Sequence, residues 1–374
     1  LKVIGNSNAN VEAIGFEKSN TSKTVDGITY QVYSHTDAPT AKLWVQQNLI
    51  VSTSIAQGFV MNGENAYDYS GRSVSSAGDV NGDGLDDLIV GAYKADPVGK
   101  SKAGKSYVVF GKTNATAINL SDIASNSGTG GFVINGEKAG GSSGYSVSSA
   151  GDVNGDGLDD LIVGACYGRG GDSAGKSYVV FGKTNATAIN LSDIASNSGT
   201  GGFVINGENA NRDSNGQSVS SAGDVNGDGL DDLIIGAYMA NSAGEYWAGK
   251  SYVVFGKTNA TAINLSDIAS NSGTGGFVIN GEESNDLSGY SVSSAGDING
   301  DGLDDLIIGA YWADSTGKSL AGKSYVIFGK TDTKAINLSD ISAGRGTTAH
   351  TIDFQGDTNT DKNDTLTGTS ANEL

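Results

Sequence analysis

The stretch DVNGDGLDDLIVGA, residues 79–92, occurs four times in this chain of 374 residues with almost no change. It returns from Asp152, from Asp224 as DVNGDGLDDLIIGA and from Asp297 as DINGDGLDDLIIGA, at spacings of 73, 72 and 73 residues. This period is too long for most helical solenoids and fits a blade of four strands with generous loops. The repeat predicts an array of four similar structural units.

Short runs rich in Val, Ile, Phe and Tyr, bounded by Gly, Asn and Ser, follow one another in each copy. In the second copy these runs are Tyr145–Ala150, Leu161–Ala165, Ser177–Gly182 and Phe203–Asn206. Such runs are typical of strands, and we expect one helical turn, SDIAS, with Ser192 as its N-cap. Four-stranded units in tandem favour a radial arrangement over a sandwich. The predicted fold is an all-β β-propeller of four-stranded blades.

The number of expected strands favours a closed four-bladed ring. Four copies supply the first three strands of each blade, and fourth strands begin at Phe132, Phe203 and Phe277. The run Phe59–Asn62 precedes the first copy and matches these fourth strands, so it would complete the last blade. The run Thr351–Phe354 is a further strand candidate, which leaves the closure open.

We expect three parts in the chain. The propeller spans 58–356, between an N-terminal extension, 1–57, and a tail, 357–374. The extension contains the strand-like VDGITYQVYS and a predicted helix in AKLWVQQNLIV.

Composition excludes several classes of function. The formal net charge of −19 disfavours binding to nucleic acid or to anionic membranes, and no apolar stretch is long enough to span a bilayer. The single cysteine, Cys166, excludes an intramolecular disulfide. Both histidines, His35 and His350, lie outside the repeats. We expect no enzymatic activity.

Each acidic loop has oxygen-bearing side chains at positions 1, 3, 5 and 9, a backbone carbonyl available at position 7 and a turn-forming Gly at position 6. Calcium prefers six or more oxygen ligands, and no His or Cys cluster is present to hold zinc. The sequence predicts about four Ca²⁺ ions, in loops 79–87, 152–160, 224–232 and 297–305. The predicted ligands are Asp79, Asn81, Asp83, Leu85 and Asp87; Asp152, Asn154, Asp156, Leu158 and Asp160; Asp224, Asn226, Asp228, Leu230 and Asp232; and Asp297, Asn299, Asp301, Leu303 and Asp305.

This loop is not an EF-hand, because position 12 is Val or Ile instead of a bidentate Glu. The run SVSSAGDVNGDGLDDLIVGAY, with AGKSYVVFGK and GFVINGE after it, resembles the FG-GAP repeat of integrin α-subunit propellers and their bacterial relatives. The resemblance covers roughly residues 58–330. It implies calcium in the hairpin between the first and second strands of each blade. Integrin propellers have seven blades, whereas this chain shows four.

The tail contains NDTLTGTSANEL, which is similar to the beginning of RTX-type calcium repeats of secreted bacterial proteins. This similarity implies export and a larger parent protein. We therefore expect a bacterial, secreted protein located outside the cell or at its surface.

Three functions remain open on the sequence alone. The first is an adhesion or interaction module that binds a surface protein. The second is a structural subunit of a surface layer, sheath or filament, which would form an oligomer by self-association. The third is a lectin-like propeller that binds a glycan.

The four copies differ mainly in two connections, from the second to the third strand and from the fourth strand to the next first strand. Successive turns of an antiparallel blade alternate between its two ends. We therefore expect both varying connections on one face and the calcium loops on the other. Aromatic and Arg side chains are enriched at interfaces. The predicted partner face consists of Tyr93, Arg169, Arg212, Tyr246, Trp247 and Trp312.

Overall fold

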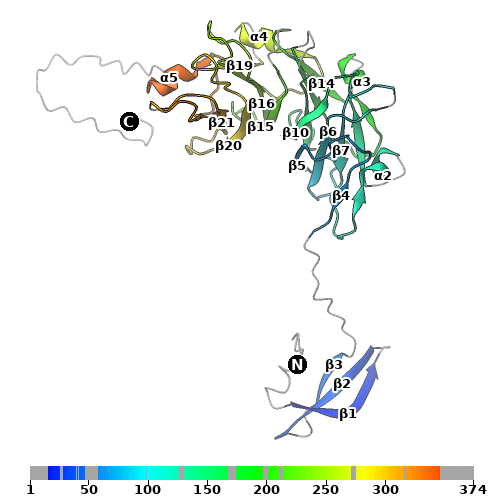
Figure 1. Cartoon of the computed structure of the whole chain (residues 1–374). Helices are drawn as coiled ribbons and strands as arrows, with labels where there is room; N and C mark the ends of the chain where they lie inside the picture. Colours follow the sequence, from blue (N-terminus) through cyan, green and yellow to red (C-terminus); the bar gives the residue numbers. More distant parts are fainter. Residues whose placement is uncertain are drawn as a thin grey trace, which may run out of the picture. The chain divides into compact units, whose positions relative to one another are not determined.

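The computed structural model describes residues 16–25, 28–38, 40, 42–46, 58–97, 99–125, 130–166, 174–196, 201–209, 214–270, 275–315 and 317–345 (Figure 1). The chain divides into two compact units, Leu1–Phe59 and Val60–Leu374. The strand candidate Thr351–Phe354 and the tail 357–374 lie outside the described residues.

The first unit is a three-stranded antiparallel sheet of β1 (Phe16–Val25), β2 (Ile28–His35) and β3 (Lys42–Gln46). Tyr33 of β2 is buried. The prediction of a helix in AKLWVQQNLIV is wrong for the residues of this segment that the structure describes, because residues 42–46 form β3. Leu43 of this strand pairs with Tyr33 of β2, so the backbone finds its hydrogen-bond partners on a neighbouring strand instead of within a helix.

The second unit consists of four blades that share one strand order. Blade 1 contains β5, β6, β7 and β9, and blades 2 and 3 repeat it; blade 4 has three described strands. The first strands are β5 (Ser73–Gly78), β10 (Ser143–Gly151), β15 (Ser218–Gly223) and β20 (Ser291–Gly296). The second strands are β6 (Asp87–Ala92), β11 (Asp160–Ala165), β16 (Asp232–Ala237) and β21 (Asp305–Ala310). The third strands are β7 (Lys105–Val109), β12 (Lys176–Val180), β17 (Lys250–Val254) and β22 (Lys323–Ile327). Strands of the fourth kind are β4 (Met61–Asn62), β9 (Gly131–Asn135), β14 (Gly202–Asn206) and β19 (Gly276–Asn280). The predicted all-β fold of four-stranded blades is confirmed.

A two-residue strand and one helical turn lie between the third and fourth strands. The short strands are β8 (Ile118–Asn119), β13 (Ile189–Asn190), β18 (Ile263–Asn264) and β23 (Ile336–Asn337). The helices are α2 (Leu120–Ala124), α3 (Leu191–Ala195), α4 (Leu265–Ala269) and α5 (Leu338–Ser342). Each of β13, β18 and β23 pairs in parallel with the fourth strand of the preceding blade.

The N-cap predicted at Ser192 is wrong, because Asn190 is the N-cap of α3 and Ser192 lies inside the helix. Asn190 keeps an extended backbone since it pairs with Asn135 in the parallel ladder. Leu191 and Ile194 are buried and fix the turn directly after it.

The expected closure of the ring by Phe59–Asn62 is not what the structure shows. Among the described strands, β4 pairs with β8 and not with the last blade. Figure 1 shows the blades following one another along an open arc, from β5, β6 and β7 to β20 and β21.

The hydrophobic core lies between neighbouring blades. One buried cluster joins Val80 and Ile89 of blade 1 to Leu161 and Tyr178 of blade 2, and equivalent clusters join the later blades. Burying apolar surface between two blades stabilises the fold by about 25 cal/mol for each Å² that is removed from water. The side chains of these three clusters are therefore covered by contact between two blades.

Two equivalent glycines test this packing. Gly151 and Gly296 both have positive φ, 71° and 65°. A Cβ on Gly151 would lie 2.2 Å from the Asp231 carboxylate of the next blade, whereas a Cβ on Gly296 meets nothing within 4 Å. We expect both Ala variants to lose about 1–2 kcal/mol of unfolding free energy through backbone strain. Gly151→Ala should lose about 1–3 kcal/mol more through overpacking. Urea unfolding measures both, and equal losses would contradict the packing described.

Candidate functional site

Each acidic loop is the hairpin turn between the first and second strands of its blade. Gly151 at the end of β10 pairs with Asp160 at the start of β11, and the other three blades repeat this register. Position 1 therefore follows one strand directly and position 9 begins the next. The register brings both ends of the nine-residue loop together.

The carboxylate at position 1 accepts hydrogen bonds from the backbone of its own loop. Asp152 Oδ1 accepts from the N–H groups of Gly155 at 2.7 Å and Asp156 at 3.1 Å, and Oδ2 accepts from Gly157 at 2.9 Å. In the first loop, the equivalent hydrogen bonds, that from Gly84 above all, lower the pKa of Asp79. Backbone amides therefore favour the ionised form of Asp79.

The carboxylate at position 9 is fully buried in all four loops. Asp160 accepts hydrogen bonds from the N–H groups of Val153 at 3.1 Å and Gly182 at 2.8 Å, and the amide of Asn154 lies 3.3 Å away. Burial raises the pKa of Asp160 to about 8; the hydrogen bond from Gly182 opposes this rise, and the charge of Asp156 adds to it. Burial likewise raises the pKa of Asp232 to about 8 and that of Asp87 to about 6.

The carboxylate, amide and carbonyl oxygens of each loop are the ligands that a hard cation prefers. Their side chains are not arranged around one common point in this structure. In the described part of the chain, no ion pair joins Lys or Arg to a predicted ligand, so the buried negative charge has no basic partner. Within the same residues, no three His, Cys, Asp or Glu side chains are arranged to hold a metal ion. The structure brings positions 1, 3, 5 and 9 into one loop but turns position 1 toward backbone amides.

The leucine at position 7 has a second role. The Leu158 side chain lies beside Gly82 of the preceding blade's loop, and Leu230 and Leu303 repeat this arrangement. Leu85 has no preceding blade among the described residues and is 40% exposed. The side chains at this position therefore pack between loops.

Position 8 joins neighbouring loops, a role that we did not predict. Asp159 Oδ2 accepts a hydrogen bond from the Asp79 N–H of the preceding blade at 2.8 Å. The Asp159 N–H in turn donates to the Asp79 carbonyl at 3.3 Å. Asp231 and Asp304 repeat the side-chain bond at 2.8 and 2.9 Å. The repeated Asp-Asp pair was the only sign of this interaction in the sequence.

A partly buried ion pair also links consecutive blades. Glu137, two residues after β9, accepts hydrogen bonds from Lys176 Nζ at 2.8 Å and from the Tyr178 hydroxyl, both on β12. Glu64, Glu208 and Glu282 bind the equivalent Lys and Tyr pairs. Burial raises the pKa of Glu137, but the hydrogen bonds from Lys176 and Tyr178 outweigh it and the net pKa is lowered.

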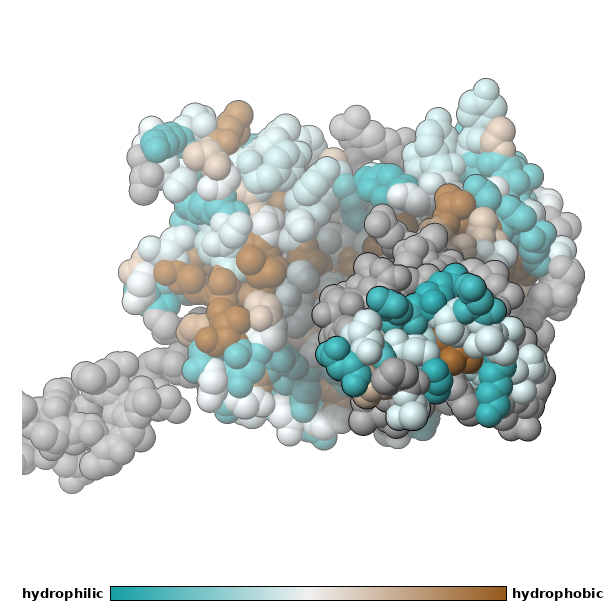
Figure 2. Space-filling view, turned by 90° about the horizontal axis from the view of Figure 1, so that it is seen from below, coloured by the Kyte–Doolittle hydropathy of each residue, from teal (hydrophilic) through white to brown (hydrophobic). Residues whose placement is uncertain are grey.

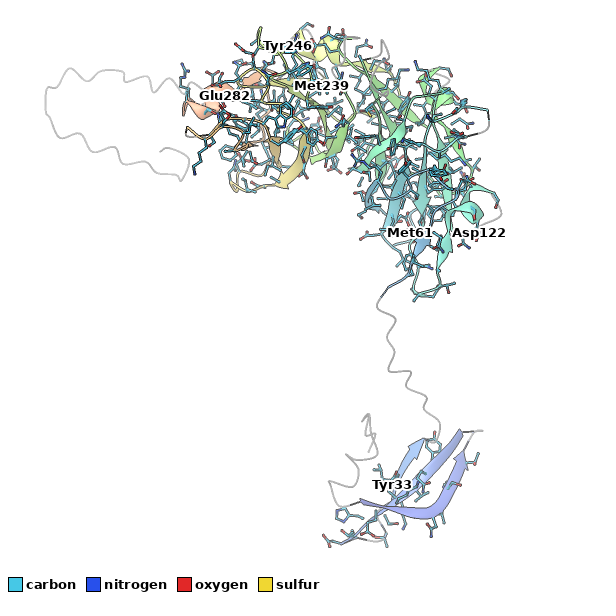
Figure 3. All side chains as sticks on the ribbon, in the orientation of Figure 1. Tyr33, Met61, Asp122, Met239, Tyr246 and Glu282 are labelled. Atoms are coloured by element: carbon cyan, nitrogen blue, oxygen red, sulfur yellow. The ribbon has the colours of Figure 1, made fainter. Side chains whose placement is uncertain are left out.

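The two varying connections are hydrogen-bonded to each other, at the strand ends away from the acidic loops. The N–H groups of Asn285 and Leu287 donate to the carbonyls of Tyr246 and Trp247 at 2.9 and 3.2 Å. Figure 3 places Tyr246 at the edge of the array. Arg169 and Arg212 of the predicted partner face lie outside the described residues.

Aromatic side chains line these connections. Tyr246 is 54% exposed and stacks on Trp247 with ring centroids 4.7 Å apart. Trp312 is 42% exposed and lies 5.6 Å from Tyr311. Tyr93 packs at 5.3 Å against Tyr145 of the next blade. Tyr69, Tyr145, Tyr290 and Tyr311 belong to the same surface and were not predicted.

The comparisons with known proteins identify the repeats. Residues 70–109, 143–180, 215–254 and 288–327 match the FG-GAP repeat family. Integrin alpha pat-2 of Caenorhabditis elegans is 27% identical over 282 residues, which are 74% of this chain and 21% of that protein. Integrin alpha pat-2 of Caenorhabditis briggsae is 31% identical over 54% of this chain and 15% of its own length. Human integrin alpha-IIb is 29% identical over 50% of this chain and 16% of its own length. The chain spans about a fifth or less of these relatives.

The Asp159 interaction can be tested against a natural control. Asp86 occupies the same position in blade 1 but is exposed, and the described residues contain no blade before blade 1. We expect Asp159→Ala to lower the free energy of unfolding by about 1–3 kcal/mol, because the Asp79 N–H loses its partner. Asp86→Ala should change it by less than about 0.5 kcal/mol. Denaturant titration of both variants measures the difference, and similar values would contradict a role in joining blades.

Proposed function

We propose, on the premise that the chain carries four FG-GAP repeats, that it is a calcium-stabilised interaction module that works outside the cell and binds a protein ligand. The observation that carries this proposal is the exposed aromatic surface on the varying connections, held on blades whose other end bears the acidic loops. Nothing in the comparisons points to catalysis. Among the described residues, no helix is long and apolar enough to cross a membrane.

Calcium is the cation that the loops would take. Buried carboxylates without a basic partner destabilise the folded chain when ionised, and a divalent cation offsets that charge. All ligands would be oxygen atoms, as calcium prefers. Residues at positions 1, 3, 5, 7 and 9 would hold it, with the position 1 carboxylate turning partly from the backbone amides toward the ion. Extracellular calcium modules bind at about 10⁻⁴–10⁻³ M, which fits a protein outside the cell.

Secretion from a bacterium remains a prediction from the sequence. It rests on the RTX-like residues within 357–374, which lie outside the described residues. The size of the parent protein rests on the same residues.

Chelation tests the calcium proposal. We expect EGTA to lower the melting temperature and to increase protease sensitivity, because binding stabilises the folded state by about 2.7 kcal/mol per site at a hundredfold excess over Kd. Scanning calorimetry with and without millimolar calcium measures this effect. An unchanged melting curve would contradict the proposal.

Two variants of one loop provide the matched control. Asp156→Ala removes a predicted ligand and should lower the calcium stoichiometry in calorimetric titration by about one site. Asp159→Ala, three residues further on, should leave the stoichiometry unchanged although it weakens the blade contact. Equal losses of calcium from both variants would show that the ligand positions are wrong.

Two properties of the varying connections support their role as the partner surface, namely their aromatic and basic side chains and their hydrogen-bonded backbone. Tyr, Trp and Arg dominate binding energy at protein interfaces. Here Arg72 lies 4.5 Å above the Tyr145 ring and Lys94 lies 4.4 Å above the Tyr69 ring, so basic groups accompany the aromatic ones. Hydrogen bonds between the two connections hold the backbone in place. A rigid surface loses little entropy on binding.

We expect the double variant Trp247→Ala and Trp312→Ala to lose binding by at least about 2 kcal/mol, as at interface hot spots. Calcium uptake and melting temperature should stay nearly unchanged, because Trp312 is exposed, Trp247 is only partly buried, and neither belongs to an acidic loop. The measurement is binding of labelled chain to arrays of purified extracellular proteins and of glycans. Binding to proteins that survives the double change would place the interface elsewhere, and binding to glycans alone would favour a lectin.

A further inference from the structure

We propose that neighbouring acidic loops are coupled, so that they take up calcium cooperatively instead of independently. The carboxylates at position 8, those of Asp159, Asp231 and Asp304, act as positioning residues in this coupling. The inference rests on the proposed function, because it takes calcium binding by the loops as its premise. It adds a role for residues that are not predicted ligands, and it uses only the three junctions between described blades.

Each junction joins two acidic loops through a pair of hydrogen bonds. Asp79, at position 1 of the first loop, donates its N–H to Asp159 Oδ2 at 2.8 Å, and its carbonyl accepts from the Asp159 N–H at 3.3 Å. Asp231 and Asp304 repeat the side-chain bond at 2.8 and 2.9 Å and the backbone bond at 3.3 and 3.1 Å. A predicted ligand of one loop therefore has both of its backbone groups bonded to one residue of the next blade.

Position 8 lies between two predicted ligands of its own loop. Asp159 is preceded by Leu158, whose carbonyl is the predicted ligand at position 7, and is followed by Asp160 at position 9. Planar peptide bonds link the three residues, so a shift of Asp159 reorients the peptide groups on both sides of it. The contact with Asp79 thus connects position 1 of one loop to positions 7 and 9 of the next.

A second path of hydrogen bonds joins the buried position 9 carboxylates of neighbouring loops. Val80 donates its N–H to Asp87 Oδ2 at 3.1 Å, and its carbonyl accepts from the Lys183 N–H at 2.7 Å. The residue before Lys183, Gly182, donates to Asp160 Oδ1 at 2.8 Å. The same three bonds recur at the next two junctions, so the path runs through Asp87, Asp160, Asp232 and Asp305.

Much of this second path is shielded from water. Val80, Asp87 and Asp160 are all 0% exposed. The Leu158 side chain lies beside Gly82 of the preceding loop, and Figure 2 shows apolar side chains next to hydrophilic ones on the array. Hydrogen bonds are stronger in such surroundings than in water, and consecutive bonds polarise one another. A change in the position of one buried carboxylate is therefore felt at the next.

The ordering of these shared segments makes the coupling positive. The Asp152 carboxylate accepts backbone N–H groups of its own loop in this structure, and its own N–H donates to Asp231. If Asp152 turns toward an ion and is held there, the segment around Asp231 that bonds to it is held as well. The next loop then binds its ion at a lower cost in conformational entropy, which is positive cooperativity.

Charge alone would act in the opposite direction. A cation in one loop makes the surroundings of the next loop less negative and weakens its attraction for a second cation. This opposing effect is small, since each loop has four carboxylates, at positions 1, 5, 8 and 9, and keeps a formal charge of −2 with one Ca²⁺ bound. Salt also screens exposed charges, with a Debye length of about 8 Å at 0.15 M. Ordering of the backbone does not depend on salt in this way, so it determines the sign of the coupling.

Native mass spectrometry of the full chain at half-saturating calcium tests the inference, because it counts the ions on each molecule. We expect the empty and four-ion forms of the wild type to dominate, with partly filled forms below their binomial proportions. Asp231→Ala weakens the middle junction and divides the four loops into two pairs. The two-ion form should rise at least about fivefold, the lower limit of typical coupling factors, while saturation still reaches four ions.

Two variants of the same junction serve as controls. Asp231→Asn keeps an oxygen that accepts the Asp152 N–H, and it should bind calcium with the wild-type distribution. Glu208→Gln weakens the contact between the same two blades away from the acidic loops, where Glu208 accepts a hydrogen bond from Lys250 Nζ at 2.7 Å. It should also leave the distribution unchanged. An equal rise of the two-ion form in Glu208→Gln would show that any weakening of the junction suffices, and would overturn the role of position 8.

The remaining outcomes separate this inference from the calcium proposal. Four ions bound to the wild type in binomial proportions would overturn the coupling and leave calcium binding intact. A two-ion form that stays as rare in Asp231→Ala as in the wild type would likewise overturn it. The absence of bound calcium at millimolar concentration would overturn both proposals.

Discussion

The contact between one blade and the next is the interaction on which the rest of this structure depends. Three of the four buried hydrophobic clusters among the described residues draw side chains from two neighbouring blades, as Val80 and Leu161 show. The same contact carries the Asp159 to Asp79 hydrogen bond and the Glu137 link to Lys176 and Tyr178. Stability in such an array is close to a sum of units and of their contacts. The covering of the shared core clusters and the hydrogen bonds between neighbouring acidic loops both follow from this one repeated junction.

The acidic loops are placed where this junction makes negative charge costly. The register of each hairpin buries the position 9 carboxylate, and Asp160 shows the consequence, because its pKa rises to about 8. Asp152 in the same loop remains stabilised by backbone amides. One carboxylate is thus satisfied by the protein, while the other gains from a proton or a cation. This difference within nine residues is why we propose calcium as a component of the folded state and not as an incidental surface ion.

The two ends of the strands differ in how much their loops vary between the four copies. At the end that carries the acidic loops, the copies agree in sequence and the same hydrogen bonds recur at each junction. A substitution there would alter the contact between two blades. At the other end, the connections differ between copies and expose aromatic rings such as Tyr246 and Trp312. Their backbones are still fixed by hydrogen bonds between connections. The array can therefore vary its surface chemistry without altering the contacts that hold it together.

The sequence by itself determined the repeat, the all-β class, the strands and the hairpin position of the acidic loops, because these depend on local periodicity and turn residues. It predicted the ligand positions of the loops, and the structure shows that these positions share one loop. Only the tertiary structure decided that residues 42–46 form a strand, that Asn190 and not Ser192 caps α3, and that β4 pairs with β8. It also decided that Asp159 serves the preceding blade, across 80 residues of sequence. A periodic pattern in the sequence predicts that a side chain is buried. Which residue buries it depends on contacts between segments far apart in the sequence, and those contacts form only when the blades pack against one another.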